Sequence, residues 1–159
     1  MFWLLPGPEF QKLSAGERRD QFRELVDSDS VPGVLAYEGD DAVGWCAVGP
    51  RSWYARLQRS PMLPASERDD PGMWSVNCFY TAAARRRSGV TRHLLDAAIQ
   101  HAVVSGARAI EGYPVDAPGR SRIPASELYT GTVDLFSSCG FREAARRTPR
   151  RVVMRRDLR

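Results

Sequence analysis

Residues 74–95 constrain the fold most, because their pattern of apolar residues changes at a single glycine. Residues 74–80, WSVNCFY, are rich in aromatic and β-branched side chains, which predicts a strand. From Val90 onward the apolar residues recur every three or four positions, which predicts a helix that ends near Gly106. Residues 107–113, ARAIEGY, predict a second strand. A strand, helix and strand of this length imply a parallel pair with a right-handed crossover.

The loop between the first strand and the helix is basic, with Arg85, Arg86 and Arg87 before Gly89. The first turn of a helix leaves backbone N–H groups without partners, and the helix macrodipole adds partial positive charge there. Gly89 allows a close approach of the backbone because it has no Cβ. Guanidinium groups match phosphate oxygens with forked donors. We therefore expect a ligand that carries a pyrophosphate; the alternative is a solvated arginine cluster over an ordinary loop.

Two known phosphate loops are excluded by the residues present. A Walker A loop ends in Gly-Lys-Ser/Thr, but Lys12 is the only lysine in the chain. A dinucleotide fingerprint needs three spaced glycines, and this loop holds Gly89 alone.

The flanking segments add paired strands. Residues 33–37 and 42–48 predict a β-hairpin, and residues 141–147 and 151–156 predict a final strand pair. A short helix is expected to begin at Thr132, or two residues earlier, and to stop before Gly140.

The N-terminal part predicts one capped helix. Ser14 and Glu17 fit a capping box, and the helix should run to about residue 26. Its inner face should carry Phe22, Leu25 and Val26. Residues 2–5 are apolar and predict either a strand remnant or an apolar plug.

Residues 86–91, RRSGVT, resemble the loop of the GNAT superfamily of acyl-CoA-dependent N-acetyltransferases, which reads Gln/Arg-x-x-Gly-x-Gly/Ala. Thr91 departs from the last position, where it either crowds the pyrophosphate or donates its hydroxyl to it. Residues 135–141, LFSSCGF, resemble the family's short helix that closes through Gly-Phe into a strand. Residues 111–116 and 130–132 resemble a bacterial subgroup of unassigned acceptor.

The resemblance implies an α/β fold (α+β, with a mixed sheet) in a single domain over residues 1–159. A central mixed sheet of about six strands, splayed in the middle, should be flanked by about four helices. Members of the subgroup carry extra residues before the position of Met1, which supply a first strand, so we expect this chain to lack that N-terminal strand.

The resemblance also implies acetyl-CoA as co-substrate and places its binding groups. The backbone of Phe79, Tyr80 and Thr81 should hydrogen-bond the pantetheine arm as an added strand would. The thioester carbonyl should lie near Asn77 and Cys78, where a backbone N–H could stabilise an oxyanion. The residues expected to hold the pyrophosphate are Arg86, Arg87, Ser88, Gly89, Val90, Thr91 and Arg92.

Direct attack of an amine on the thioester needs a neutral amine, and hence a general base or a water relay. Glu111 is the first candidate base, Asp116 a weaker one; the alternative for Glu111 is a surface carboxylate that balances arginines. The family's usual acid is a tyrosine, but this chain has Phe136 there, which cannot donate a proton. Tyr129 is the candidate replacement, and a half-buried packing role is its alternative.

Aromatic residues are abundant around these positions. They either line an acceptor pocket or belong to the core, and Trp53 and Tyr54 are better pocket candidates than Trp45 and Trp74. Cys78 is not expected to act as a nucleophile, because no histidine lies near it in the sequence.

The amino-acid composition limits the partners, metal sites and cellular compartment that we expect. The net charge of +4 and a pI of about 9.3 suit a polyanionic partner such as coenzyme A or a nucleic acid. Three cysteines without a CxxC pair, and two histidines eight residues apart, predict neither a disulfide framework nor a metal site. We expect a reducing cytoplasm, no signal peptide and no membrane span.

Three functions compete. The first is an N-acetyltransferase that moves an acetyl group from acetyl-CoA to a primary amine of a small molecule or peptide. The second is a CoA-binding sensor with weak catalysis, suggested by Phe136. The third, a basic nucleic-acid-binding protein, ranks last because no RRM, KH or helix-turn-helix pattern is present. A homodimer is common in such folds, but nothing in the sequence fixes it.

Overall fold

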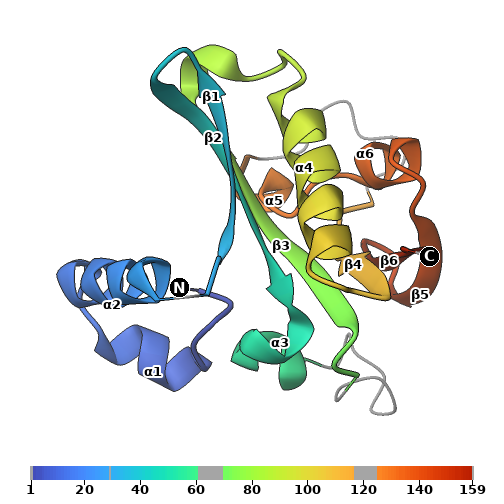
Figure 1. The fold of residues 1–159 in the computed structure, drawn as a ribbon. Helices are drawn as coiled ribbons and strands as arrows, with labels where there is room; N and C mark the ends of the chain where they lie inside the picture. The colour runs from blue at the N-terminus through green and yellow to red at the C-terminus, as the bar shows by residue number, and fades with distance from the viewer. Residues whose placement is uncertain (1, 29, 61–69, 117–124, 159) are drawn as a thin grey trace.

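A computed structural model describes residues 2–28, 30–60, 70–116 and 125–158. Its centre is a six-stranded mixed sheet in the order β1-β2-β3-β4-β6-β5 (Figure 1). β3 and β4 are parallel, and the other neighbouring strands are antiparallel. The strands are β1 (Gly33–Glu38), β2 (Asp41–Pro50), β3 (Met73–Thr81), β4 (Ala109–Gly112), β5 (Arg142–Thr148) and β6 (Arg151–Asp157).

The helices lie around this sheet and vary in length. The α-helices are α1 (Gly7–Lys12), α2 (Ala15–Asp27), α3 (Ala55–Gln58), α4 (Val90–Val104), α5 (Ala125–Leu128) and α6 (Val133–Ser138), with 3-10 turns η1 (Arg51–Trp53) and η3 (Ala83–Arg85). None of the helices in the described ranges has the length and apolar character needed to span a bilayer. The mixed sheet, its hairpin and its final strand pair confirm the fold expected from the sequence.

The crossover helix α4 packs on one face of β1, β2 and β3. Its apolar stripe is buried as the periodicity predicts, through Leu94, Leu95, Ala98, Ile99 and Ala102. Gly44 of β2 allows the close approach, because a Cβ there would lie 2.8 Å from a methyl of Val90. The opposite face of the sheet carries a smaller apolar cluster, centred on Tyr54, Leu57, Tyr113 and Val153.

The two middle strands, β3 and β4, diverge as expected. β3 pairs with β4 only from Met73 to Val76, where β4 reaches Gly112. Farther along, the N–H of Phe79 donates to the carbonyl oxygen of Tyr129 at 2.7 Å instead. The second half of β3 therefore borders a gap rather than a strand.

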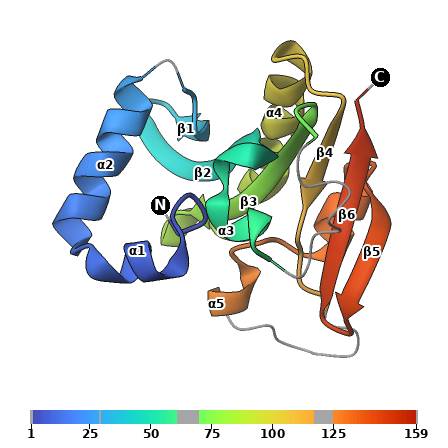
Figure 2. The same cartoon turned by 90° about the horizontal axis from the view of Figure 1, so that it is seen from below.

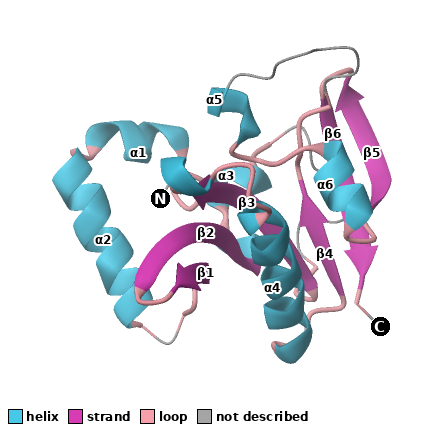
Figure 3. Ribbon diagram, turned by 90° about the horizontal axis from the view of Figure 1, so that it is seen from above, coloured by secondary structure: helices cyan, strands magenta, loops and turns pink. Residues whose placement is uncertain are grey.

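The N-terminal segment differs in part from the prediction. The capping box at Ser14 and Glu17 is present. The expected inner face holds in part: Phe22 and Leu25 are half-buried and Phe22 packs against Trp45, but Val26 is 51% exposed and no residue of α2 is fully buried. The reason is that α1 and α2 stand beside the sheet rather than on its face (Figures 2 and 3). Residues 2–5 form a turn, not a strand.

Candidate active site

The first part of the site is the start of α4. Gly89 caps the helix with a φ of +85°, and no side chain caps it. The backbone N–H groups of Val90 and Thr91 have no acceptor among the described residues. A Cβ built on Gly89 would meet no atom within 4 Å, so this helix end is open. Such an end fits an anionic group, as free amides and the macrodipole act together.

The predicted arginines of this loop separate into two groups. Arg85 is paired with Glu38, and Arg92 donates to Ser138 at 3.1 and 3.3 Å. Arg86 and Arg87 are exposed and make no ion pair or hydrogen bond through their side chains to any residue in the described part of the chain. These two guanidinium groups are therefore available to a phosphate, whereas the Arg92 side chain already donates to Ser138 of α6.

The two hydroxyl side chains of the predicted loop also make hydrogen bonds within the protein. The Ser88 hydroxyl donates to the Arg85 carbonyl oxygen at 2.6 Å. The Thr91 hydroxyl lies 3.4 Å from that of Thr81, so it links the end of β3 to the start of α4. Thr91, which stands where the family has Gly or Ala, therefore has a hydrogen-bonding partner within the protein.

The backbone of β3 alternates between its two sides. The N–H of Phe79 faces the gap, where the Tyr129 carbonyl takes it. Successive residues of a strand face opposite sides, so Thr81 also faces the gap and Tyr80 faces β2. The groups left for a ligand in the gap are the Phe79 carbonyl and both backbone groups of Thr81.

A β-bulge lies in the middle of the same strand. Ala47 of β2 opposes Cys78, but Val48 opposes Val76, so Asn77 has no partner in β2. The pairing with β4 has also ended at Val76. Bulges of this kind free backbone groups and re-aim side chains next to functional sites.

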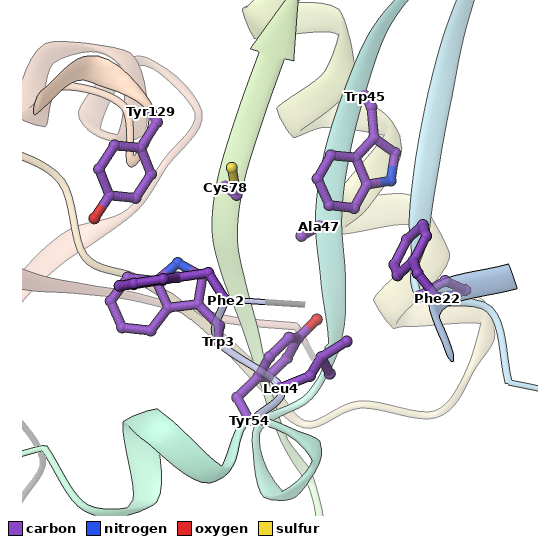
Figure 4. Close-up of a pocket in the computed structure, with 10 residues that line it drawn as sticks. Phe2, Trp3, Leu4, Phe22, Trp45, Ala47, Tyr54, Cys78 and Tyr129 are labelled. Atoms are coloured by element: carbon purple, nitrogen blue, oxygen red, sulfur yellow. The ribbon is translucent and has the colours of Figure 1, made fainter. Parts of the chain in front are cut away.

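A cavity of about 510 Å³ opens beside the bulge, on the face of the sheet opposite α4 (Figure 4). In Figure 4, Cys78 lies between Tyr129 on one side and Trp45 on the other. The lining residues are Phe2, Trp3, Leu4, Phe22, Pro32, Trp45, Ala47, Tyr54, Cys78 and Tyr129. Burial raises the pKa of the Cys78 thiol, so this sulfur stays protonated and is a poor nucleophile.

Tyr54 forms part of the same cavity. Burial raises the pKa of its hydroxyl well above the ordinary value, and the nearby Asn77 side chain opposes this only in part. The hydroxyl therefore stays protonated and neutral across the physiological range. Of the four aromatic candidates from the sequence, Trp45 and Tyr54 line the cavity. Trp74 is in the core, and Trp53 does not line this cavity.

Glu111 lies outside this cavity, in a buried ion-pair network. Its Oε2 accepts from Arg51 Nη1 at 3.0 Å and from the Tyr113 hydroxyl at 3.1 Å. Its Oε1 accepts from Arg155 at 2.6 and 2.9 Å. Glu111 and Arg51 are both 0% exposed. Both carboxylate oxygens of Glu111 already accept hydrogen bonds inside the protein, so this geometry favours a positioning role, and the general-base role stays a prediction.

The remaining predicted residues lie elsewhere. Asp116 is paired with Arg146 at 2.6 Å. Phe136 is fully buried against Phe79 and Phe141. Among the described residues no group of three or more His, Cys, Asp or Glu is placed to hold a metal ion.

Several cavity residues were not predicted from the sequence as site residues. Phe2, Trp3 and Leu4 had been interpreted as a strand remnant or plug, and Phe22 as part of the inner face of its helix. The aromatic run at the N-terminus was a usable signal, since exposed clusters of this kind often cover a binding site. Ala47 and Pro32 carry no signal that would have identified them.

Comparison with known proteins gives one consistent result. Residues 1–122 match the model of the acetyltransferase (GNAT) family. A GCN5-related N-acetyltransferase from Kribbella flavida is 25% identical over 87% of this chain and 76% of its own, with a TM-score of 0.56. Comparison with curated proteins finds no match.

Two further solved structures share the fold. A ribosomal-protein-alanine N-acetyltransferase from Brucella melitensis is 21% identical over 92% of this chain and 80% of its own, with a TM-score of 0.57. A Bacillus subtilis acetyltransferase solved in complex with CoA is 17% identical over 89% and 84%, with a TM-score of 0.55.

Proposed function

Because the chain belongs to the GNAT acetyltransferase family, we propose that it transfers an acetyl group from acetyl-CoA to a primary amine by direct attack. The observation that carries the proposal is the open start of α4, whose unpaired amides lie beside the exposed Arg86 and Arg87. β3 leads from this loop to the cavity. Cys78 is three residues, or about 10 Å of strand, before Thr81.

The chain supplies separate binding groups for the two ends of the co-substrate. The amides of Val90 and Thr91 and the two free arginines hold the pyrophosphate. The Phe79 carbonyl and the backbone of Thr81 hold the pantetheine arm. Acetyl-CoA supplies the acyl group as a thioester, which this arrangement directs toward the bulge at Asn77.

Three features then act on the reacting groups. Backbone N–H groups at the bulge stabilise the negative charge that develops on the carbonyl oxygen. The apolar cavity disfavours the ammonium form of the acceptor and so supplies a neutral amine. The Tyr129 hydroxyl donates a proton to the departing sulfur, in the role that Phe136 cannot perform, and the proton that the attacking nitrogen loses returns to Tyr129 through water.

The test is calorimetric titration with acetyl-CoA, followed by detection of the released thiol over a panel of amines. We expect the double variant Arg86→Ala, Arg87→Ala to bind acetyl-CoA roughly 10- to 100-fold more weakly, since two charge-assisted contacts are lost. The matched control is Arg19→Ala, Arg23→Ala on α2, which removes the same charge from an exposed surface and should bind like the wild type.

The outcomes distinguish the competing functions. Absence of acetyl-CoA binding by the wild type would refute the proposal. Binding without thiol release across the panel would favour a CoA-binding sensor.

A further inference from the structure

The cavity beside Cys78 has a largely aromatic wall. Apart from Tyr129, five of the nine lining residues are aromatic, and they come from the N-terminal turn, α2, β2 and the segment before α3: Phe2, Trp3, Phe22, Trp45 and Tyr54. No aspartate, glutamate, lysine, arginine or histidine lines it among the described residues. No carboxylate lines the described wall, so a second positive charge on a ligand would have only aromatic faces to contact and no counter-charge.

The wall is held in place before any ligand binds. The Trp45 ring lies over Gly33, where a Cβ would be only 2.6 Å from its Nε1. Phe22 meets the same ring edge-on, with centroids 5.8 Å apart at 84°. An aromatic surface fixed in this way binds a flat apolar group with little loss of conformational entropy.

The apolar surface continues outward from the cavity. The strand register places Leu35, Trp45 and Tyr80 in one row across β1, β2 and β3. Leu35 is 54% exposed and Tyr80 59% exposed. An exposed apolar row next to a cavity indicates a path for an apolar ligand rather than for a charged peptide.

Two buried polar atoms of the wall have no partner. They are Trp3 Nε1 and the Tyr54 hydroxyl; neither makes a hydrogen bond of normal geometry in the described structure, although the Asn77 side chain lies near the Tyr54 hydroxyl and lowers its pKa. Buried donors are costly when unpaired, so a ligand with a neutral acceptor atom would satisfy them. Burial raises the pKa of the Tyr54 hydroxyl, so the hydroxyl stays neutral and offers a second ammonium group no counter-charge.

We propose that the acceptor is a small monoamine with an uncharged aromatic body, which the cavity holds with its amino group toward Cys78. This inference rests on the proposed function and names its acceptor class. The buried aromatic wall binds the body, and burial favours the neutral amine that must attack. A diamine or a lysine side chain in a polar peptide would bury a second charge or several polar groups without a partner.

The test compares 2-phenylethylamine with 1,4-diaminobutane and with a lysine-containing peptide, at fixed acetyl-CoA. We expect kcat/KM for 2-phenylethylamine to exceed that of either other amine by roughly 100-fold, because an unpaired buried charge is rejected strongly. Faster turnover of the diamine or the peptide overturns the inference while leaving the acetyltransferase function intact.

A cavity-filling variant gives an independent measurement. Ala47 is 6% exposed and lines the cavity, so Ala47→Leu should lower kcat/KM for 2-phenylethylamine at least 10-fold with unchanged acetyl-CoA affinity. Ala97→Leu, on the exposed side of α4, is the matched control and should behave as the wild type. An Ala47→Leu enzyme with normal kcat/KM and normal acetyl-CoA binding contradicts the inference.

Direct binding separates this inference from the proposed function. If no amine is turned over, 2-phenylethylamine is titrated alone against the fluorescence of the cavity tryptophans. Saturable binding that Ala47→Leu abolishes and Ala97→Leu retains supports the aromatic site, and absence of binding to the wild type refutes it.

Discussion

Replacing Glu111 by glutamine decides between its two roles. The carboxylate is fully buried and accepts from Arg51, Arg155 and Tyr113. A glutamine leaves the buried Arg51 without a counter-charge, and breaking a buried ion pair in this way costs about 3–5 kcal/mol. For a domain of this size, about 2–4 °C per kcal/mol, the melting temperature should fall by roughly 6–20 °C. Activity of the folded variant should remain within about 10-fold of the wild type.

The assay is thermal unfolding together with kcat over a range of pH, measured well below the melting temperature. Glu143→Gln is the matched control, because that side chain is 44% exposed and paired with Arg146, a surface pair worth less than about 1 kcal/mol. If Glu111 were the general base, its replacement would affect kcat more than the melting temperature. If Glu111→Gln melted like the wild type but lost 10²-fold or more in kcat, with a flattened pH profile, the positioning role would be wrong.

Three further expectations concern the loop, the proposed acid and the buried thiols. Arg87 has a φ of +67°, which glycine adopts without strain, so Arg87→Gly should raise the stability by up to about 1 kcal/mol. Arg86 has a φ of −66°, so Arg86→Gly should lower the stability by about 0.5–1 kcal/mol. Equal melting temperatures of the two variants would contradict this. Tyr129→Phe should lower kcat about 10²-fold with unchanged acetyl-CoA affinity, and Tyr37→Phe, on an exposed residue, should change neither. Burial raises the pKa of Cys46 well above 9.0, so the folded thiol keeps its proton while the unfolded one loses it, and stability should fall as the pH rises above about 9. Melting curves from pH 8 to 10.5 test this, and a Cys46→Ala variant should show the shallower decline.

Local sequence patterns were sufficient to predict the elements around the proposed co-substrate site. The β-prone run of residues 74–80, the glycine and the apolar periodicity from Val90 are each read within one segment, and the structure has β3, the loop and α4 at these places. The same holds for the Ser14 capping box, whose two hydrogen bonds lie within four residues.

Contacts between distant segments could not be predicted in this way. Arg51 is 60 residues from Glu111, and an arginine after a proline is usually exposed, yet here it is fully buried. The same applies to Arg92, which belongs to the predicted phosphate loop but bonds Ser138, 46 residues away. The cavity wall likewise joins Phe22 of α2 to Trp45 of β2, a pairing that depends on how α2 stands beside the sheet.

The most direct test of the central claim follows the backbone amides at the start of α4 by NMR during titration with CoA. We expect the amide signals of Gly89, Val90 and Thr91 to shift strongly and saturably, while those of α2 stay unchanged. The same titration with pantetheine, which lacks the pyrophosphate, should leave the three loop signals nearly in place. Saturable binding of CoA with no shift at these amides would contradict the claim that this helix end holds the pyrophosphate.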